Sequence, residues 1–112
     1  MSPITTHILD LESGLPAAEV SVTLAKEESG SWKELATGKT DGDGRIKNLL
    51  AAGSLTPGYY RICFNVESYF RGKNKKTFYR TIPVEFNIEV VDRHFHVPLL
   101  ISPFGYSTYR GS

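Results

Sequence analysis

Cysteine is almost absent from this chain, which has a single one, Cys63, among 112 residues. One thiol cannot close a disulfide within the chain, so a disulfide-stapled scaffold is excluded. Cys63 lies in the apolar run from Tyr59 to Val66, where a buried, unreactive thiol is expected rather than a nucleophile. Because free thiols suit a reducing compartment, a cytoplasmic location is the default expectation.

Long apolar runs are also missing. No stretch reaches the ~18 consecutive apolar residues of a membrane-spanning helix, so no span is expected. The N-terminal MSPITTHILDL has no basic segment followed by a long apolar one, which argues against a signal peptide. The final residues, Arg110-Gly111-Ser112, do not form a peroxisomal address.

No excess of one charge is present either, since 13 basic and 12 acidic residues leave a formal net charge of +1. Such a chain has no broad field to attract nucleic acid or an anionic membrane, so neither is expected as a partner. The short basic segment from Arg71 to Lys76 is then expected to be a solvated loop. A length of 112 residues with 40% hydrophobic residues fits one compact domain spanning residues 1–112.

What the chain does have is a succession of short strand patterns in which apolar and polar residues alternate. Val84, Phe86, Ile88 and Val90, for example, alternate with Glu85, Asn87 and Glu89. About eight such segments, separated by turns, indicate an all-β sandwich. The expected strands are Thr5–Leu11, Val20–Ala25, Trp32–Thr37, a short strand from Arg45, Tyr59–Val66, Val84–Val90, Phe95–Ile101 and Gly105–Arg110.

One short helix is expected over Ser68–Gly72, with Ser68 as its N-cap and Gly72 at its end. The segment Gly14-Leu15-Pro16 is typical of a turn. The run from Val97 to Ile101 is apolar on both faces, whereas a sandwich strand needs only one apolar face, so a partner subunit is expected to cover the second. Pro98 lacks a backbone donor, which requires an edge, a bulge or a place where no donor is needed.

Side chains able to do acid–base chemistry are concentrated in the histidines. Because residues i and i+2 of a strand share a face, His94 and His96 point the same way. A reasonable arrangement puts His7, His96, Ser107 and Tyr109 on one sheet face, which would suit a wet pocket at a subunit interface. His94, beside Asp92 and Arg93, best fits an ordinary surface histidine.

Metal sites and covalent catalysis find less support. The turn Asp41-x-Asp43-Gly44 resembles the start of a calcium loop but lacks the downstream glutamate at the required position. The three histidines could hold zinc, an alternative that spacing alone leaves open. No nucleophile elbow accompanies a Ser-His-Asp or Cys-His set.

The C-terminal run HFHVPLLISPFGYSTYRGS, from His94 to Ser112, resembles the 5-hydroxyisourate hydrolases of the transthyretin-like family. The final Tyr-Arg-Gly-Ser separates these enzymes from transthyretin, the hormone carrier with the same fold. The segments Thr6-His-Ile-Leu-Asp10, Gly14-x-Pro-Ala17 and Lys39-Thr-Asp-x-Asp-Gly-Arg45 are similar as well. The resemblance therefore covers essentially the whole chain.

This resemblance implies a sandwich of two four-stranded sheets with a short helix, assembled as a homotetramer, a dimer of dimers with active sites in the channel between dimers. It also implies a reaction without a cofactor or metal. The N1–C6 amide bond of 5-hydroxyisourate is hydrolysed to 2-oxo-4-hydroxy-4-carboxy-5-ureidoimidazoline, on the path of urate degradation to allantoin.

The family's active-site positions carry over as His7, Arg45 and His96, which are the expected catalytic residues. The tail, Tyr109, Arg110, Gly111 and Ser112, is expected to line the substrate site together with Ser107. One histidine would activate water and the other protonate the leaving nitrogen, while Arg45 holds substrate atoms.

Three other functions stay open from the sequence alone. A transthyretin-like carrier would need an open apolar channel and would not depend on the two histidines and Arg45. A structural or carbohydrate-binding sandwich could use Tyr59, Tyr60 and Phe70, and a zinc hydrolase could use the three histidines.

Overall fold

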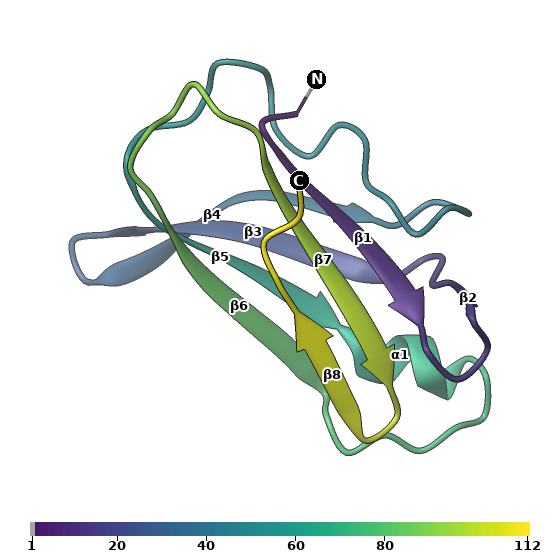
Figure 1. The fold of residues 1–112 in the computed structure, drawn as a ribbon. Helices are drawn as coiled ribbons and strands as arrows, with labels where there is room; N and C mark the ends of the chain where they lie inside the picture. Colours follow the sequence, from purple (N-terminus) through teal and green to yellow (C-terminus); the bar gives the residue numbers. More distant parts are fainter. Residues whose placement is uncertain (1) are drawn as a thin grey trace.

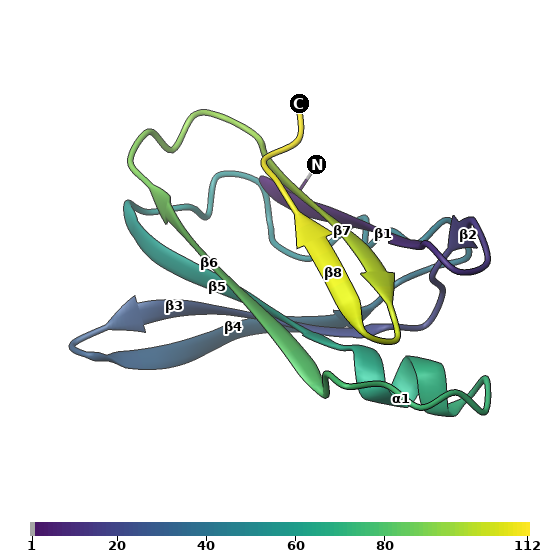
Figure 2. The ribbon, with the colours of Figure 1, turned by 60° about the horizontal axis from the view of Figure 1, so that its bottom comes forward.

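The computed structural model describes residues 2–112 as two four-stranded sheets packed face to face, with one short helix at one end (Figures 1 and 2). The first sheet has the order β2-β1-β7-β8, formed by Leu15–Pro16, Ile4–Asp10, Phe95–Ser102 and Gly105–Thr108. The second has the order β4-β3-β5-β6, formed by Ser31–Lys39, Ser21–Glu28, Gly58–Asn65 and Thr81–Ile88. The predicted all-β sandwich with one short helix is confirmed.

The hydrophobic core fills the space between the two sheets. Strand β1 shows why: Ile4, Thr6 and Ile8 are buried and alternate with half-buried outward residues, as the period of 2 in a strand requires. The same alternation turns aromatic and branched side chains of the second sheet inward, among them Tyr60, Ile62 and Phe64 of β5. Both sheets thus keep one face free of core side chains.

Strands β1 and β7 lie side by side and run parallel in the centre of the first sheet (Figure 1). Their register places Thr5 opposite His96 and His7 opposite Pro98. Residues 91 positions apart in the sequence are therefore neighbours, and this pairing fixes where the histidines can meet.

The helix begins earlier than predicted. It spans Val66–Arg71, and its N-cap is Asn65, whose side chain accepts a hydrogen bond from the Ser68 amide at 3.2 Å. The prediction of Ser68 as N-cap is therefore wrong. Gly72 does end the helix, but with a φ of −63° it stays in the right-handed region.

Two short segments also differ from their predicted secondary structure. Leu15–Pro16, expected to be a turn, forms β2 against Leu9 and Asp10. The strand expected from Arg45 is absent from the described residues 2–112, where Arg45 makes a single antiparallel bridge to His7 instead. The last strand ends at Thr108 rather than Arg110.

An ion pair with a buried carboxylate ties α1 and its following loop to the first sheet. The Asp10 carboxylate, fully buried at the end of β1, accepts hydrogen bonds from the Tyr69 hydroxyl at 2.7 Å and the Lys73 ammonium at 3.2 Å. Burial by itself would raise the pKa of Asp10, but these bonds and those from the backbone amides of Glu12 and Ser13 hold it below its ordinary value.

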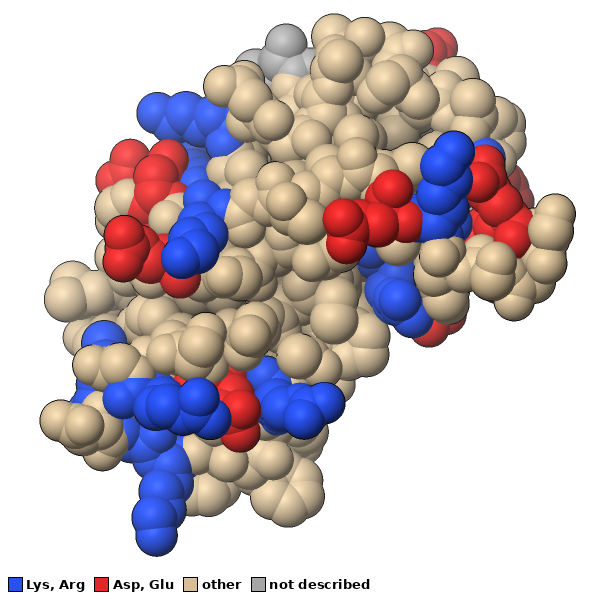
Figure 3. All heavy atoms as spheres, turned by 180° about the vertical axis from the view of Figure 1, so that it is seen from behind, with Lys and Arg blue, Asp and Glu red and all other residues tan. Residues whose placement is uncertain are grey.

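The charged surface agrees with the near-zero net charge. Seen from behind, Lys and Arg side chains lie interspersed with Asp and Glu rather than forming one field (Figure 3). Within residues 2–112, the single helix is too short to cross a membrane.

Candidate active site

The outer face of the first sheet carries the polar side chains of β1 and β7. Thr5 and His7 are half-buried on the side of β1 away from the core. His96 of β7 lies opposite Thr5 and shares that side, as the alternation of both strands predicted. Two of the three expected catalytic residues therefore lie on one face.

A tight turn positions Arg45, the third expected catalytic residue. The Asp41 carboxylate accepts hydrogen bonds from the backbone amides of Asp43 at 2.9 Å and Arg45 at 3.1 Å, which closes the turn. Gly44 then docks on β1, where its carbonyl accepts the Ile8 amide at 2.9 Å. Arg45 is placed directly beside His7 as a result, in the antiparallel bridge.

Gly44 is required at this position for two reasons. Its φ of +75° lies in the left-handed region that glycine adopts without strain. A Cβ there would also stand 2.5 Å from the Ile8 carbonyl oxygen. The turn can approach β1 this closely only because position 44 has no side chain.

The C-terminal tail reaches the same face by continuing along β7. The ladder between β7 and β8 ends at Thr108, whose hydroxyl donates to the Pro98 carbonyl at 2.7 Å. It resumes where the Gly111 amide donates to the His96 carbonyl at 2.8 Å. Pro98 thus occupies the gap in this ladder, which explains how an interior strand tolerates a residue without a backbone donor.

Several of these residues line a hollow in the protein surface. It is lined by Arg45 and His96, by Ser112 of the tail, and by Thr5, Thr6, Ile46, Lys47, Asn48 and His94. His7 lies in an adjoining hollow with Pro16 and Asp43, and Arg45 and Lys47 line both. The structure therefore brings the three expected catalytic residues to one continuous region around Arg45.

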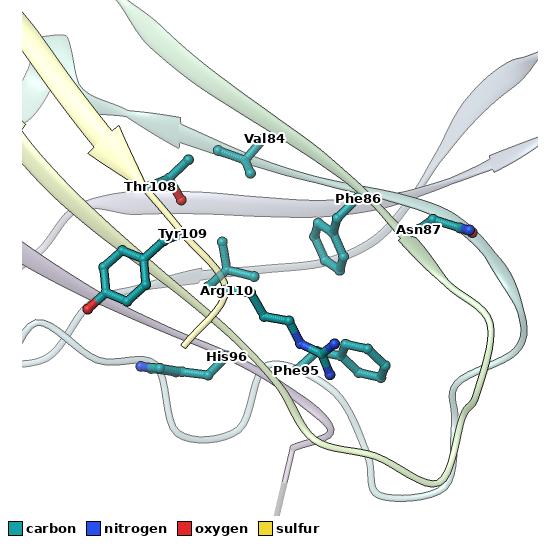
Figure 4. Close-up of a pocket in the computed structure, with 9 residues that line it drawn as sticks. Val84, Phe86, Asn87, Phe95, His96, Thr108, Tyr109 and Arg110 are labelled. Carbon is teal, nitrogen blue, oxygen red and sulfur yellow. The ribbon is translucent and has the colours of Figure 1, made fainter. Parts of the chain in front are cut away.

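The remaining expected site residues are placed differently. Tyr109 and Arg110 line a second depression, between the edges of the two sheets (Figure 4). The Arg110 guanidinium lies over the ring of Phe95, 4.9 Å from its centroid, which anchors the tail. Ser107 is exposed on β8, opposite Leu100. In the single chain, only Ser112 of the tail lines the hollow with Arg45 and His96.

His96 has an environment that keeps it neutral. Burial lowers the pKa of its imidazole, and the nearness of His94, His7 and Arg45 lowers it further, because a positive charge on any of these groups disfavours another on His96. A histidine with its pKa below the ordinary value of about 6.5 is unprotonated at neutral pH. His96 can therefore accept a proton from a bound water molecule.

His94 and Thr5 are the site residues that sequence reasoning missed. The Thr5 hydroxyl oxygen lies 2.9 Å from Nε2 of His94 and 2.8 Å from Nδ1 of His96. The two imidazoles stand nearly parallel, with centroids 6.3 Å apart. The shared face of residues 94 and 96 was the available signal, but the register that puts Thr5 between them was not readable from the sequence.

These groups suit hydrolysis of an activated amide. A neutral imidazole can take a proton from water, and a guanidinium offers fixed donors where oxyanion charge develops. Within the described residues 2–112, no three His, Cys, Asp or Glu side chains lie close enough together to hold a metal ion. The zinc alternative thus finds no ligand set in that part of the chain.

Comparison with known proteins gives one consistent relationship. The model of the HIUase/transthyretin family matches residues 4–111. A 5-hydroxyisourate hydrolase of Salmonella dublin is 49% identical over 109 residues, 97% of this chain and 80% of the relative. Among solved structures, sea bream transthyretin in complex with thyroxine has a TM-score of 0.94 at 32% identity, covering 98% and 95% of the two chains. The 5-hydroxyisourate hydrolase of Klebsiella pneumoniae has a TM-score of 0.85 at 36% identity, covering 97% and 98%.

Proposed function

The chain belongs to the HIUase/transthyretin family, and we propose that it hydrolyses 5-hydroxyisourate in the breakdown of urate. The observation that carries this proposal is the placement of His7, Arg45 and His96 along two adjoining hollows that share Arg45, which results from the docked Gly44 turn and the β1–β7 register. Three separate segments of the chain bring these polar side chains together. A surface that binds no polar ligand would not need this arrangement.

The residues take the following roles. His96 accepts a proton from water as the water oxygen forms a bond to carbon C6 of the substrate. Arg45 donates hydrogen bonds to the oxygen that becomes negative at C6. The C6–N1 bond then breaks, and His7, across the bridge from Arg45, supplies the proton that N1 takes up. Ser112 binds the substrate at the hollow's rim, and no cofactor enters the reaction.

Fold similarity does not separate this activity from ligand transport, because a transthyretin matches the structure as well as a hydrolase does. The chemistry of the hollow supports hydrolysis. A carrier of apolar ligands needs an apolar channel, whereas Arg45, Lys47 and two histidines line this one. The close sequence relatives also point to the hydrolase.

We further propose that the chain acts as a cytoplasmic homotetramer, a dimer of dimers, with each domain of residues 1–112 contributing one copy of the hollow. Support comes from the openness of the site, since His7, Arg45 and His96 all lie on the outer face of a sheet. A second subunit on this face would exclude water from it and add Tyr109 and Ser107 to a shared channel.

The test follows the decay of freshly generated 5-hydroxyisourate by its absorbance, with and without the protein. We expect strong acceleration over the spontaneous rate, unchanged by a chelator. His7→Ala and His96→Ala should each lower kcat by about 10²–10⁴-fold, the usual worth of a general acid or base. Lys33→Ala, on the distant β4, is the matched control and should be fully active. Decay no faster than in buffer would overturn the proposal and favour a carrier.

A further inference from the structure

The Thr5 hydroxyl lies between the imidazole of His96, the base of the proposed reaction, and the imidazole of His94, which has no role in that reaction. It lies within hydrogen-bond distance of Nδ1 of His96 and Nε2 of His94, and these are the nitrogens nearest to it on each ring. Resting on the proposed hydrolase function, we propose that Thr5 and His94 are positioning residues that keep the proton of neutral His96 on Nδ1, so that Nε2 is free to accept one from water.

Counting protons limits the possible arrangements. A threonine hydroxyl has one proton to donate and lone pairs that accept. If Thr5 donates to His94, then Nδ1–H of His96 donates to Thr5, and Nε2 of His96 is bare. If His94 donates to Thr5 and the hydroxyl proton points at Nδ1 of His96, Nε2 must carry the proton. If both rings donate to the two lone pairs of the hydroxyl, Nε2 of His96 is bare again, but the hydroxyl proton has no acceptor among these three residues. The first arrangement is the one that leaves His96 a base on the side away from Thr5 and also gives the hydroxyl proton an acceptor, His94.

The contacts of the His96 ring leave Nε2 as its nitrogen away from Thr5. Nδ1 is held by Thr5, while Cδ2, the ring atom next to Nε2, lies against the tail at Gly111. His96 is neutral for the reasons given above, so the choice between its two ring nitrogens decides whether it can act. A neutral imidazole free in water prefers the proton on Nε2, so a partner for Nδ1–H is needed to reverse that preference.

The chain from His96 to Thr5 to His94 also survives the reaction without rearrangement. When Nε2 of His96 takes a proton from water, Nδ1–H still donates to Thr5 and Thr5 still donates to His94. The imidazolium that forms is stabilised by a hydrogen bond already in place, which is the benefit of preorganisation. His94 therefore contributes as the acceptor at the end of the chain, without touching the substrate.

The test compares variants that keep or remove each link. Thr5→Val removes the hydroxyl at nearly constant shape, and Thr5→Ser keeps it. His94→Leu removes the terminal acceptor, and His94→Gln restores an oxygen acceptor at the reach of Nε2. Thr37→Val, on an exposed stretch of β4, is the matched control for replacing a strand threonine.

The primary readout is the tautomer of His96, measured from nitrogen–proton couplings in ¹⁵N-histidine-labelled protein at a pH where its imidazole is neutral. We expect Nδ1–H in the wild type, Thr5→Ser, His94→Gln and Thr37→Val, and a shift towards Nε2–H in Thr5→Val and His94→Leu. kcat should fall about 10²-fold in the latter two with KM nearly unchanged.

A wild-type His96 protonated on Nε2 would overturn the inference, as would Thr5→Val that keeps both Nδ1–H and the wild-type kcat. The tautomer measurement needs no substrate. If 5-hydroxyisourate were not hydrolysed at all, the proposed function would fall while the proton arrangement remained measurable on its own.

Discussion

Gly111 is the residue on which the geometry of His96 depends most directly. A Cβ at this position would stand 2.6 Å from Cδ2 of His96 and 3.1 Å from Cγ of Pro98. Neither neighbour can move freely, because His96 is held by Thr5 and Pro98 lies in the interior strand β7. The absence of a side chain at 111 is what lets the tail lie flat on the imidazole.

Replacing Gly111 with alanine should therefore impair catalysis more than stability. We expect kcat to fall on the order of 10²-fold, since a displacement of about 1 Å can cost that much, while the free energy of unfolding changes by less than about 1 kcal/mol. Steady-state kinetics and urea unfolding measure the two effects. The matched control is Gly105→Ala, where the nearest atom to a new Cβ is Ser102 Oγ at an ordinary 3.7 Å. Equal kinetics for both variants would show that the tail does not constrain His96.

At the scale of elements, the alternation of β1 and β7 was readable from the sequence because the core selects every second side chain. The short segments were not. Arg45 was expected to start a strand, but its backbone partner is His7, and such a non-local contact leaves no trace in the local pattern. The start of the helix is set by pairing as well: β5 remains paired with β6 as far as Asn65 and Thr81, so the helix begins at once after Asn65.

Non-local contacts also limited how much of the candidate site could be predicted from the sequence. His7, Arg45 and His96 were predicted through the family resemblance, and the strand period added only that His7 and His96 could share a face. Their convergence depends on the parallel register of β1 and β7, which sequence spacing does not contain. His94 was assigned to the surface because nothing local distinguishes a histidine facing solvent from one facing a threonine on another strand.

The turn from Asp41 to Gly44 is the element that carries Arg45, and its docking can be tested separately from Arg45 itself. Gly44→Ala would force a side chain into a left-handed residue and against the Ile8 carbonyl. We expect a loss of about 2–4 kcal/mol in the free energy of unfolding, from backbone strain together with the displaced turn. kcat/KM should fall at least about 10²-fold, because Arg45 would leave its place beside His7.

The control for this change lies in the same turn. A Cβ on Gly42 would meet no atom within 4 Å, and its φ lies outside the left-handed region. Gly42→Ala should therefore leave both chemical denaturation and turnover of 5-hydroxyisourate near the wild-type values. Full activity in Gly44→Ala would mean that Arg45 reaches the substrate without the docked turn.

At the scale of the whole molecule, the outer face of the first sheet carries apolar side chains that a solvent-exposed surface does not need. The run from Val97 to Ile101 was expected to be apolar on both faces, and the structure buries Val97, Leu99 and Ile101 in the core while Leu100 faces outward. Leu100 lies between Leu9 and Ser107, on the face that carries the hollow. Leu15 and Tyr109 are also more than half exposed there or at its margin. Such a surface favours a partner.

Leu100→Arg tests whether assembly on this face is needed for activity. A charge placed at the centre of the face should disfavour association, while the core, to which Leu100 contributes little, stays intact. We expect light scattering to report about four chains for the wild type and fewer for the variant, with a near-native circular dichroism spectrum and hydrolysis reduced at least about 10²-fold. Leu35→Arg, partly exposed on β4 of the other sheet, should remain a fully active assembly. A monomeric Leu100→Arg with wild-type activity would contradict this prediction. It would show that the open hollow of a single chain hydrolyses the substrate without a second subunit to exclude water.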